Sequence, residues 1–423
     1  MDINRILNGV ECTCGKIHQC DIEYVYIENG AISRLKELCR QKENILIVAD
    51  ENTYAAAGEK VENVLFDKYV RKIIFSGKTV LIPNETAIEK VKENLRDTDL
   101  ILGIGSGVIQ DLCKYVSFFS HIPYMIVATA PSMDGYASDG AAMILNGMKE
   151  TVKAGLPRAI IADTEVLKDA PMEMIKAGYG DIIGKFSALC DWKLSREING
   201  EYFCQYIYDT TYKMIETTLK TAKGLLIRDE ESIKALMEAL TVVGIMMSFA
   251  GSSRPASGSE HHLSHFFEIV SIVNSEPYLA HGTDVAYSTV ITAKIRENLL
   301  QTSFPEKRFM LDRDTYTKKM KEVYKSVADG CITLQDKVGN YSNDRTEIYK
   351  AKEQTIKKIL GEMPTSAEIE EMLHRVELDI SEFYNIYRSE KINDAIMYAK
   401  DLKDRYTVLW LNYDLTEKEQ EML

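Results

Sequence analysis

The sequence has few of the features that mark a secreted or membrane-spanning protein. Its 423 residues include only 8 cysteines and 9 prolines, and widely spaced cysteines in a long chain favour reduced thiols. No basic segment followed by an apolar run stands near the N-terminus, and the most apolar stretch covers only residues 242–251. A helix needs roughly 20 apolar residues to cross a bilayer. We therefore expect a soluble cytoplasmic protein without a membrane partner.

Basic residues are also fewer than acidic residues. Lys and Arg total 51 against 64 Asp and Glu, which gives a formal net charge of −13. An acidic surface repels polyanions, so the balance argues against a nucleic-acid partner. Because charged residues make up 27% and hydrophobic residues 45%, the composition is that of a globular protein. An anionic ligand would need a local group of basic side chains.

The pattern of apolar residues changes along the chain, and the chain is too long for a single ordinary core. Short runs rich in β-branched residues alternate with helix-length segments in the first part, and they occupy residues 44–50, 70–75, 79–83, 100–105, 123–130 and 159–163. Later segments show helical spacing almost throughout. The sequence predicts an α/β fold: a Rossmann-like parallel-sheet domain over residues 1–165 and an all-helical domain over residues 166–423, with the active site in the cleft between them.

A glycine-rich turn follows one of the expected strands. Gly103, Gly105 and Gly107 come directly before a helical segment. Glycines allow the backbone to approach a phosphate closely, and the free N–H groups of a helix N-terminus attract an anion. The turn therefore fits a nucleotide pyrophosphate, although a plain tight turn between strand and helix fits equally well.

Asp50 ends the expected strand 44–50. At that place a carboxylate can accept hydrogen bonds from an adenosine ribose and repel a 2′-phosphate, which would favour NAD over NADP. The alternative is that Asp50 caps the next helix.

Histidine is concentrated in one short segment. Of 7 histidines, His261, His262 and His265 lie within five positions, and His281 follows later. On a helix His261 and His265 share one face, whereas His262 points elsewhere. Two or three imidazoles together with the carboxylate of Asp181 would suit Zn²⁺ or a similar divalent metal. Each histidine could instead be an ordinary structural residue.

A second group of soft metal ligands lies near the N-terminus. The segment CTCGKIHQC holds Cys12, Cys14, His18 and Cys20 within nine residues. These side chains could close on a structural zinc ion, or the segment could be an ordinary hairpin. Its spacing matches no standard zinc finger, because a single residue separates the first two cysteines.

Five motifs now stand in order along the chain: GIGSGVIQD, TAPSMDGYAS at 129–138, GDIIGK at 180–185, SSRPASGSEHHLSH at 252–265 and AHGTD at 280–284. Together they resemble the sn-glycerol-1-phosphate dehydrogenases, a family in the superfamily of glycerol dehydrogenase, iron-type alcohol dehydrogenases and dehydroquinate synthase. The resemblance runs from about Asp50 to about Ser288. The last ~120 residues and the CTCGKIHQC segment match none of these motifs.

The resemblance implies roles for individual residues. It implies NAD(H), or in second place NADP(H), bound by Asp50, Gly105, Ser106, Gly107, Val108, Ile109, Asp111, Thr129, Ser132 and Ser138. One divalent metal, zinc or nickel, would be bound by Asp181, His261 and His281. Asp134 and His265 would be the catalytic residues, and the substrate would be contacted by Asp134, Asp181, His265, Arg254 and Lys185. His262 would take no part, and the protein would be a homodimer.

The implied reaction is the reversible, metal-assisted reduction of dihydroxyacetone phosphate to sn-glycerol-1-phosphate. The metal would polarise the carbonyl, and His265, or a metal-bound water relayed through Asp134, would supply the proton. The substrate phosphate needs cations, for which Arg254 and Lys185 are the candidates, with Lys153 weaker. Arg254 could instead be a structural ion-pair residue, and Lys185 a partner of Asp181.

The sequence is also compatible with other functions. Glycerol dehydrogenase would need no phosphate seat, and dehydroquinate synthase would eliminate phosphate and would usually carry glutamate where Asp181 stands. A nucleotide- and metal-binding regulatory protein without turnover is a hypothesis from a different class, which a catalytic assay separates from the enzyme. The least specific alternative is a structural role for all of these glycines and histidines.

Overall fold

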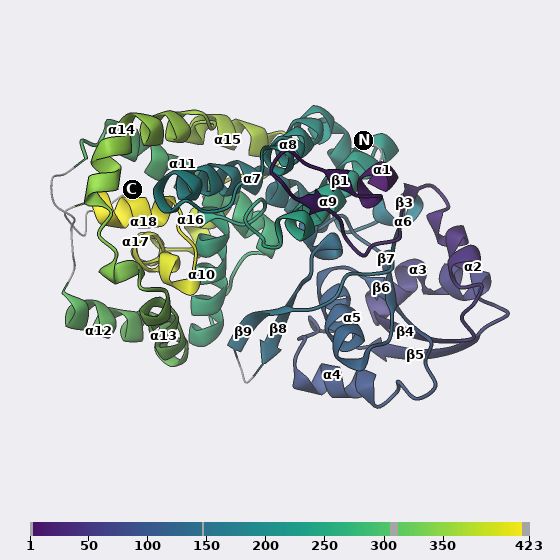
Figure 1. Ribbon diagram of the computed structural model, residues 1–423. Helices are drawn as coiled ribbons and strands as arrows, with labels where there is room; N and C mark the ends of the chain where they lie inside the picture. The colour runs from purple at the N-terminus through teal and green to yellow at the C-terminus, as the bar shows by residue number, and fades with distance from the viewer. Residues whose placement is uncertain (1–2, 146–147, 305–311, 417–423) are drawn as a thin grey trace. The chain divides into compact units, whose positions relative to one another are not determined.

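The computed structural model describes residues 3–145, 148–304 and 312–416 (Figure 1). The contacts divide the chain into two compact units, residues 1–182 with 213–253, and residues 183–212 with 254–423. The sequence predicted a single boundary after residue 165, whereas the contacts group a later helical stretch with the sheet. The reason is α9 (Glu230–Ala250), which packs on β3 (Tyr24–Glu28) and on the 3₁₀ turn η2 (Asp134–Ala137).

A six-stranded parallel sheet forms the centre of the first unit. Its strand order is β3-β10-β7-β6-β4-β5, and the remaining strands are β4 (Asn44–Asp50), β5 (Tyr69–Phe75), β6 (Leu100–Gly105), β7 (Tyr124–Ala128) and β10 (Ala159–Asp163). Every neighbouring pair in it is parallel. This confirms the predicted Rossmann-like α/β fold.

Two details of the predicted sheet need correction. The run 79–83 is not a strand, and it leaves Val80 84% and Ile82 51% exposed before Asn84 caps the next helix. The sixth strand is instead β3, where Val25 and Ile27 are buried and the alternate residues Tyr24, Tyr26 and Glu28 are not. Such alternation is typical of an edge strand with one face covered.

Helices cover both faces of the sheet. Ile45 and Ile47 of β4 pack with α3 (Glu51–Val64) on one face. Leu46 and Val48 pack with α4 (Glu85–Lys92) and α5 (Gly107–Ser120) on the other. Because successive side chains of a strand point to opposite faces, a strand covered on both sides is apolar throughout.

The first unit also contains smaller elements around the sheet. They are α1 (Ile3–Leu7), the hairpin of β1 (Val10–Glu11) and β2 (Ile17–His18), η1 (Ala31–Arg34), α2 (Leu35–Leu38), the hairpin of β8 (Gly140–Leu145) and β9 (Met148–Lys153), and α6 (Thr164–Leu167). Within the described part of the chain, α9 is the helix long and apolar enough to cross a membrane, with 72% of its apolar window buried in the protein. Burial against β3, α6 and η2 is what a core helix shows.

The second unit is helical throughout its described residues. It contains α10 (Ser259–Asn274), α11 (His281–Gln301), α12 (Arg313–Tyr324), α13 (Ala328–Val338), α14 (Thr346–Gly361), α15 (Ser366–His374), α16 (Ser381–Ile386), α17 (Ser389–Tyr398) and α18 (Val408–Leu415), with 3₁₀ turns at Lys325–Val327, Asn340–Ser342 and Ala399–Leu402. The long helices α7 (Met172–Asn199) and α8 (Gln205–Leu226) contribute residues to both units. Helix α11 packs against α10, α14, α15 and α18. The predicted helical region is confirmed.

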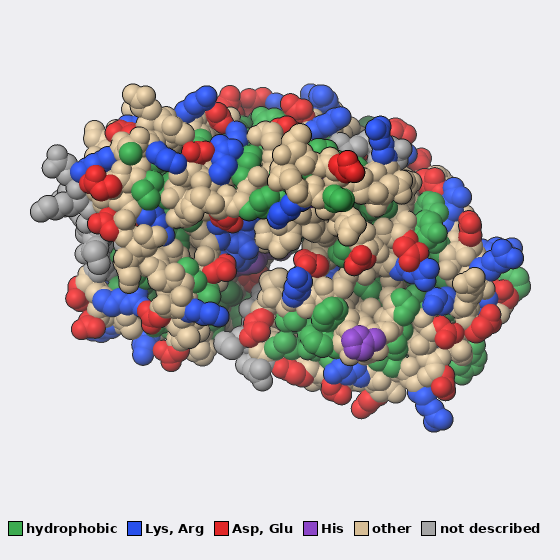
Figure 2. Space-filling view, viewed as in Figure 1, with side chains coloured by type: hydrophobic (Ala, Val, Ile, Leu, Met, Phe, Trp, Pro, Cys, Tyr) green, Lys and Arg blue, Asp and Glu red, His purple; other side chains and the backbone are tan. Residues whose placement is uncertain are grey.

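The surface carries charges of both signs. Figure 2 shows acidic and basic side chains interspersed over the face in view, in a chain with a net charge of −13.

Candidate active site

The glycine turn lies where β6 ends and α5 begins. Ser106 is the N-cap of α5, and its side chain makes no capping hydrogen bond. A Cβ on Gly105 would lie 2.6 Å from the Cβ of Ile109, so only glycine allows this close packing of the turn on the helix. The first N–H groups of α5 have no partner within the helix, which makes its N-terminus a seat for a phosphate.

Other predicted cofactor residues lie at the same edge of the sheet. Asp50 ends β4 and Thr129 follows β7, and both strands are neighbours of β6. The N–H of Thr129 donates to the carbonyl of Gly105 at 3.1 Å. The carboxyl ends of parallel strands are where doubly wound proteins bind nucleotides. Asp50 also accepts a hydrogen bond from the N–H of Thr53 at 2.9 Å, so the capping role is observed and the ribose contact stays a prediction.

Lys114 organises the segment after β7, although its only distinguishing feature in the sequence is its place one turn after Asp111. This buried lysine on α5 donates to the carbonyls of Gly135 at 3.0 Å and Gly140 at 2.7 Å. It also lies 3.5 Å from a carboxylate oxygen of Asp111 and 3.4 Å from the hydroxyl of Ser138. Burial lowers the pKa of Lys114. Two predicted cofactor residues thus share one buried cation.

Asp134 and Asp181 are brought together within the first unit. The N–H of Asp134, the first residue of η2, donates to the carboxylate of Asp181 on α7 at 3.0 Å. The close approach depends on Gly178, because a Cβ there would lie 1.8 Å from the carbonyl oxygen of Pro131. Ser132 lies in the same connection, half-buried. The motif TAPSMDG therefore holds the Asp181 carboxylate, which is 1% exposed, in one orientation.

Three histidines form a triangle within the second unit. The ring centroids of His261 and His265 on α10 are 6.1 Å apart, and the ring of His281, which begins α11, lies 5.2 Å and 5.5 Å from them. The shared helical face was predicted from the spacing. His262 is fully buried, and burial, with the charges of Lys403 and Arg405 nearby, lowers its pKa.

Glu260 fixes one member of the triangle. Its Oε1 lies 2.6 Å from Nδ1 of His261 and accepts from the N–H of Gly258 at 2.8 Å. Carboxylates in this position orient metal-binding histidines and leave Nε2 for the metal. Burial, followed by the charge of Asp191, raises the pKa of Glu260 to about 8. Burial, with the charge of Lys185, holds the pKa of His261 well below its usual value. Sequence reasoning missed Glu260, although it directly precedes the histidine pair.

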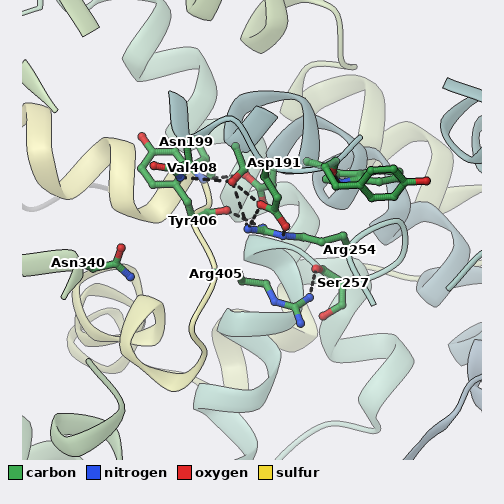
Figure 3. A network of polar contacts seen from close by, with 12 residues as sticks. Asp191, Asn199, Arg254, Ser257, Asn340, Arg405, Tyr406 and Val408 are labelled. Carbon is green, nitrogen blue, oxygen red and sulfur yellow. Dashed lines mark hydrogen bonds and ion pairs between the residues drawn. The ribbon is translucent and has the colours of Figure 1, made fainter. Parts of the chain in front are cut away.

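Two of the predicted phosphate-binding cations, Arg254 and Lys153, differ in their surroundings, because Arg254 is ion-paired and Lys153 is exposed. The guanidinium of Arg254 is 2.7 Å from Glu201 through Nε, donates to the carbonyl of Tyr406 at 2.7 Å, and lies 3.3 Å from the hydroxyl of Ser195 (Figure 3). Its contacts are those of the structural ion-pair alternative, and contact with phosphate stays a prediction. Lys153 is 83% exposed and lies 3.9 Å from Asp139.

Lys185, which was predicted to contact the phosphate, and two further cations surround residues 256–257, just before α10. Lys185 donates to the carbonyl of Ala256 at 3.1 Å, Lys403 to the hydroxyl of Ser257 at 3.2 Å, and Arg405 to the carbonyl of Ser257 at 3.0 Å. Burial, with the charge of Arg254, lowers the pKa of Arg405 to about 10. Sequence reasoning missed Lys403 and Arg405, because the C-terminal region carries no recognisable motif.

Asp181 belongs to the first unit and the histidines to the second. The complete metal set of Asp181, His261 and His281 therefore stays a prediction.

The chain is similar in sequence to known proteins. A family model described as iron-containing alcohol dehydrogenase matches residues 26–171. A protein named glycerol-1-phosphate dehydrogenase, NAD(P)+, from Halalkalibacterium halodurans is 35% identical over 296 residues, which cover 68% of this chain and 74% of that protein. A protein of the same name from Bacillus licheniformis is 29% identical over 408 residues, 94% of this chain and 90% of that one.

Solved structures agree in fold. An iron-containing alcohol dehydrogenase from Thermococcus thioreducens superposes with a TM-score of 0.61 at 15% identity, covering 96% of this chain and 97% of that one. A 1,3-propanediol oxidoreductase gives a TM-score of 0.61 at 13% identity, with 93% and 97% covered.

Proposed function

The chain belongs to the glycerol-1-phosphate dehydrogenase family within the iron-containing alcohol dehydrogenases, and from this premise we propose which residues carry out each part of the reaction. The protein is an NAD(P)-dependent oxidoreductase that reversibly reduces dihydroxyacetone phosphate to sn-glycerol-1-phosphate with a divalent metal. The observation that carries this function is the triangle of His261, His265 and His281, backed by Glu260.

The donor set fits a divalent metal. Because Nδ1 of His261 faces Glu260, Nε2 is left for coordination, and the low pKa of His261 keeps the ring neutral as a ligand requires. Asp181, His261 and His281 would hold the ion, and zinc, nickel and iron all accept such ligands. When bound, the metal and the nicotinamide supply Lewis-acid and hydride chemistry.

The chain itself must orient the substrate and supply a proton. His265 lies 5.5 Å in ring centroid from His281, close enough to serve the carbonyl oxygen of a substrate at the metal site. Asp134 donates its N–H to the Asp181 carboxylate and so positions a ligand. The glycine turn 105–107, with Asp50 and Thr129 at the same sheet edge, would bind the pyrophosphate and ribose of the cofactor.

We place the substrate phosphate beside the segment Ala256–Ser257. Lys185, Lys403 and Arg405 all hydrogen-bond to this segment. The lowered pKa of Arg405 reflects burial and crowding of positive charge, and a phosphate dianion would relieve the crowding. Arg254 would hold the segment in place through Glu201 rather than contact the phosphate.

A homodimer in the cytoplasm completes the proposal. It rests on the resemblance to the family and on the acidic composition.

The first experiment measures NADH oxidation by the purified protein with dihydroxyacetone phosphate, before and after chelation, with unphosphorylated dihydroxyacetone as the control. We expect metal-dependent turnover of the phosphate ester alone. Equal turnover of dihydroxyacetone would instead indicate a glycerol dehydrogenase. Absence of turnover by a metal-loaded protein that still binds NADH would favour the regulatory hypothesis.

A further inference from the structure

The N-terminal hairpin arranges its cysteines by a tight turn. Strands β1 and β2 pair Val10 with His18. At the turn the N–H of Cys12 donates to the carbonyl of Lys16 at 3.1 Å, and the N–H of Gly15 donates to the carbonyl of Cys12 at 3.0 Å. Gly15 has a φ of 86°, which glycine adopts without strain. The turn therefore places Cys12 and Cys14 on a short, well-defined loop before His18.

The ligand atoms of this loop are spaced as a metal requires. Sγ of Cys14 lies 3.4 Å from Nε2 of His18, and the ligand atoms of Cys12, Cys14 and His18 all lie within 4.8 Å of one another. A tetrahedral zinc with its usual bond lengths needs about 3.6 Å between sulfur and nitrogen ligands and about 3.8 Å between two sulfurs. Small side-chain adjustments would bring the three atoms onto one ion.

His18 is held in a fixed orientation. Its side chain is buried, with 2% of the residue exposed, and its ring stacks on Phe249 of α9, with centroids 5.3 Å apart and planes 13° apart. The stacking leaves Nε2 directed at the thiol of Cys14. A pre-oriented imidazole loses little entropy when it binds a metal, so this geometry favours coordination.

We propose that Cys12, Cys14 and His18 bind a structural zinc ion, separate from the catalytic metal. A structural zinc takes four protein ligands, most often cysteines with one or two histidines. Cys20, which the sequence offered as the fourth ligand, does not belong to the group of ligand atoms in the structure. The hairpin itself therefore supplies three of the four ligands, two thiolates and one imidazole.

The site differs in chemistry from the catalytic one, and this allows a clean test. The catalytic donor set consists of a carboxylate and imidazoles, whereas the hairpin supplies two thiolates. Cobalt bound by thiolates shows sulfur-to-metal charge-transfer absorption in the near ultraviolet, which oxygen and nitrogen ligands do not give. The absorption therefore reports on the hairpin site whether or not the proposed function holds.

The experiment uses the full chain with cobalt in place of its metals, and zinc-loaded protein for elemental analysis. We expect two metal ions per chain and the thiolate band in the unaltered protein. Cys12→Ser and Cys14→Ser should each lose one ion and the band. Cys20→Ser, a matched change in the same segment, should keep both.

Two substitutions at His18 distinguish loss of a metal ligand from misfolding as the cause of a lost ion. His18→Phe keeps a ring to stack on Phe249 and should lose the ion, whereas His18→Cys supplies a third thiolate and should keep it. Retention of the full metal content and the band by Cys14→Ser and His18→Phe would overturn the proposal. So would a cobalt-loaded, unaltered protein without the band.

Discussion

At the scale of single residues, the site depends on the contacts of two carboxylates, one with a neighbour in the sequence and one with a residue distant along the chain. Glu260 meets His261 side by side on α10, and Asp181 receives the N–H of Asp134. These contacts orient two proposed metal ligands, because Glu260 faces the ring of His261 and the N–H of Asp134 faces the carboxylate of Asp181. Spacing alone indicated the histidines, but it could not indicate which carboxylate would contact which ring, because side-chain direction depends on packing.

Replacement of the Glu260 carboxyl group by an amide tests the orientation of His261. We expect Glu260→Gln to weaken metal affinity by about 10- to 100-fold, the usual effect of losing a partner that orients a metal-bound histidine. Competition with a chelator of known affinity measures the change. The matched control is Glu268→Gln on the same helix, which should keep the affinity of the unaltered protein; equal affinity in both variants would contradict the role of Glu260.

Asp99 provides a pH-dependent contribution to stability in the first unit. Its carboxylate accepts from the N–H groups of Asn44 at 2.9 Å and Glu43 at 3.0 Å, and these bonds lower its pKa. A lowered pKa stabilises the fold above the carboxyl's unfolded value, and the contribution is lost as the pH falls through the folded value. Asp99→Asn should therefore unfold at a lower temperature than the unaltered protein at neutral pH, with the gap closing in acid. Thermal unfolding across the acid range measures it, and a gap that widens in acid would contradict the assignment.

At the scale of elements, the periodicities predicted most of the fold, and the exceptions have physical causes. Period-two and continuous apolar runs indicated five strands of the sheet, because both of its faces are covered. The run 79–83 has the same composition, but it leaves Val80 and Ile82 exposed, and burial is not visible in a local pattern. The edge strand β3 carries a weaker signal since only Val25 and Ile27 are buried.

The contact between α7 and the segment after β7 controls where Asp181 lies. Gly178→Ala would place a Cβ against the carbonyl oxygen of Pro131, whose position in the backbone allows little movement. We expect α7 to shift and kcat/KM for dihydroxyacetone phosphate to fall by about 100-fold, as displacements of roughly 1 Å commonly cause. Gly330→Ala, in the first turn of α13 with nothing within 4 Å of the added Cβ, is the control and should leave kcat/KM unchanged. Steady-state kinetics of the purified variants measure the change. An unchanged kcat/KM in Gly178→Ala would contradict the role of this contact in positioning Asp181.

At the scale of the whole molecule, residues distant along the chain meet in the second unit. Arg254 contacts Ser195, Glu201 and the carbonyl of Tyr406, while Arg405 contacts Ser257 (Figure 3). These contacts join the end of α7, the segment before α10 and the segment before α18. The C-terminal region, which matched no motif, thus supports the segment that precedes the histidines.

The two arginines should differ in what their loss affects. Arg254→Met breaks a buried ion pair and should lower the free energy of unfolding by roughly 3–5 kcal/mol. Arg405→Met should instead raise KM for dihydroxyacetone phosphate at least tenfold, with little effect on the rate with dihydroxyacetone. Denaturant unfolding and steady-state kinetics of both variants separate the roles. A KM effect confined to Arg254→Met would return the phosphate to the site first predicted from the sequence.

The sequence by itself determined the α/β and helical regions, the glycine turn, the shared face of His261 and His265, and the family. Each of these follows from local spacing, because helix and strand periodicity and motif order are properties of the chain alone. Only the tertiary structure decided that Glu260 orients His261, that Lys114 organises the residues after β7, and that Arg254 is ion-paired while Lys403 and Arg405 approach Ser257. The contacts of Lys114, Arg254, Lys403 and Arg405 join segments that are distant in the sequence, and the contact of Glu260 depends on side-chain directions that packing sets, so local spacing does not record them.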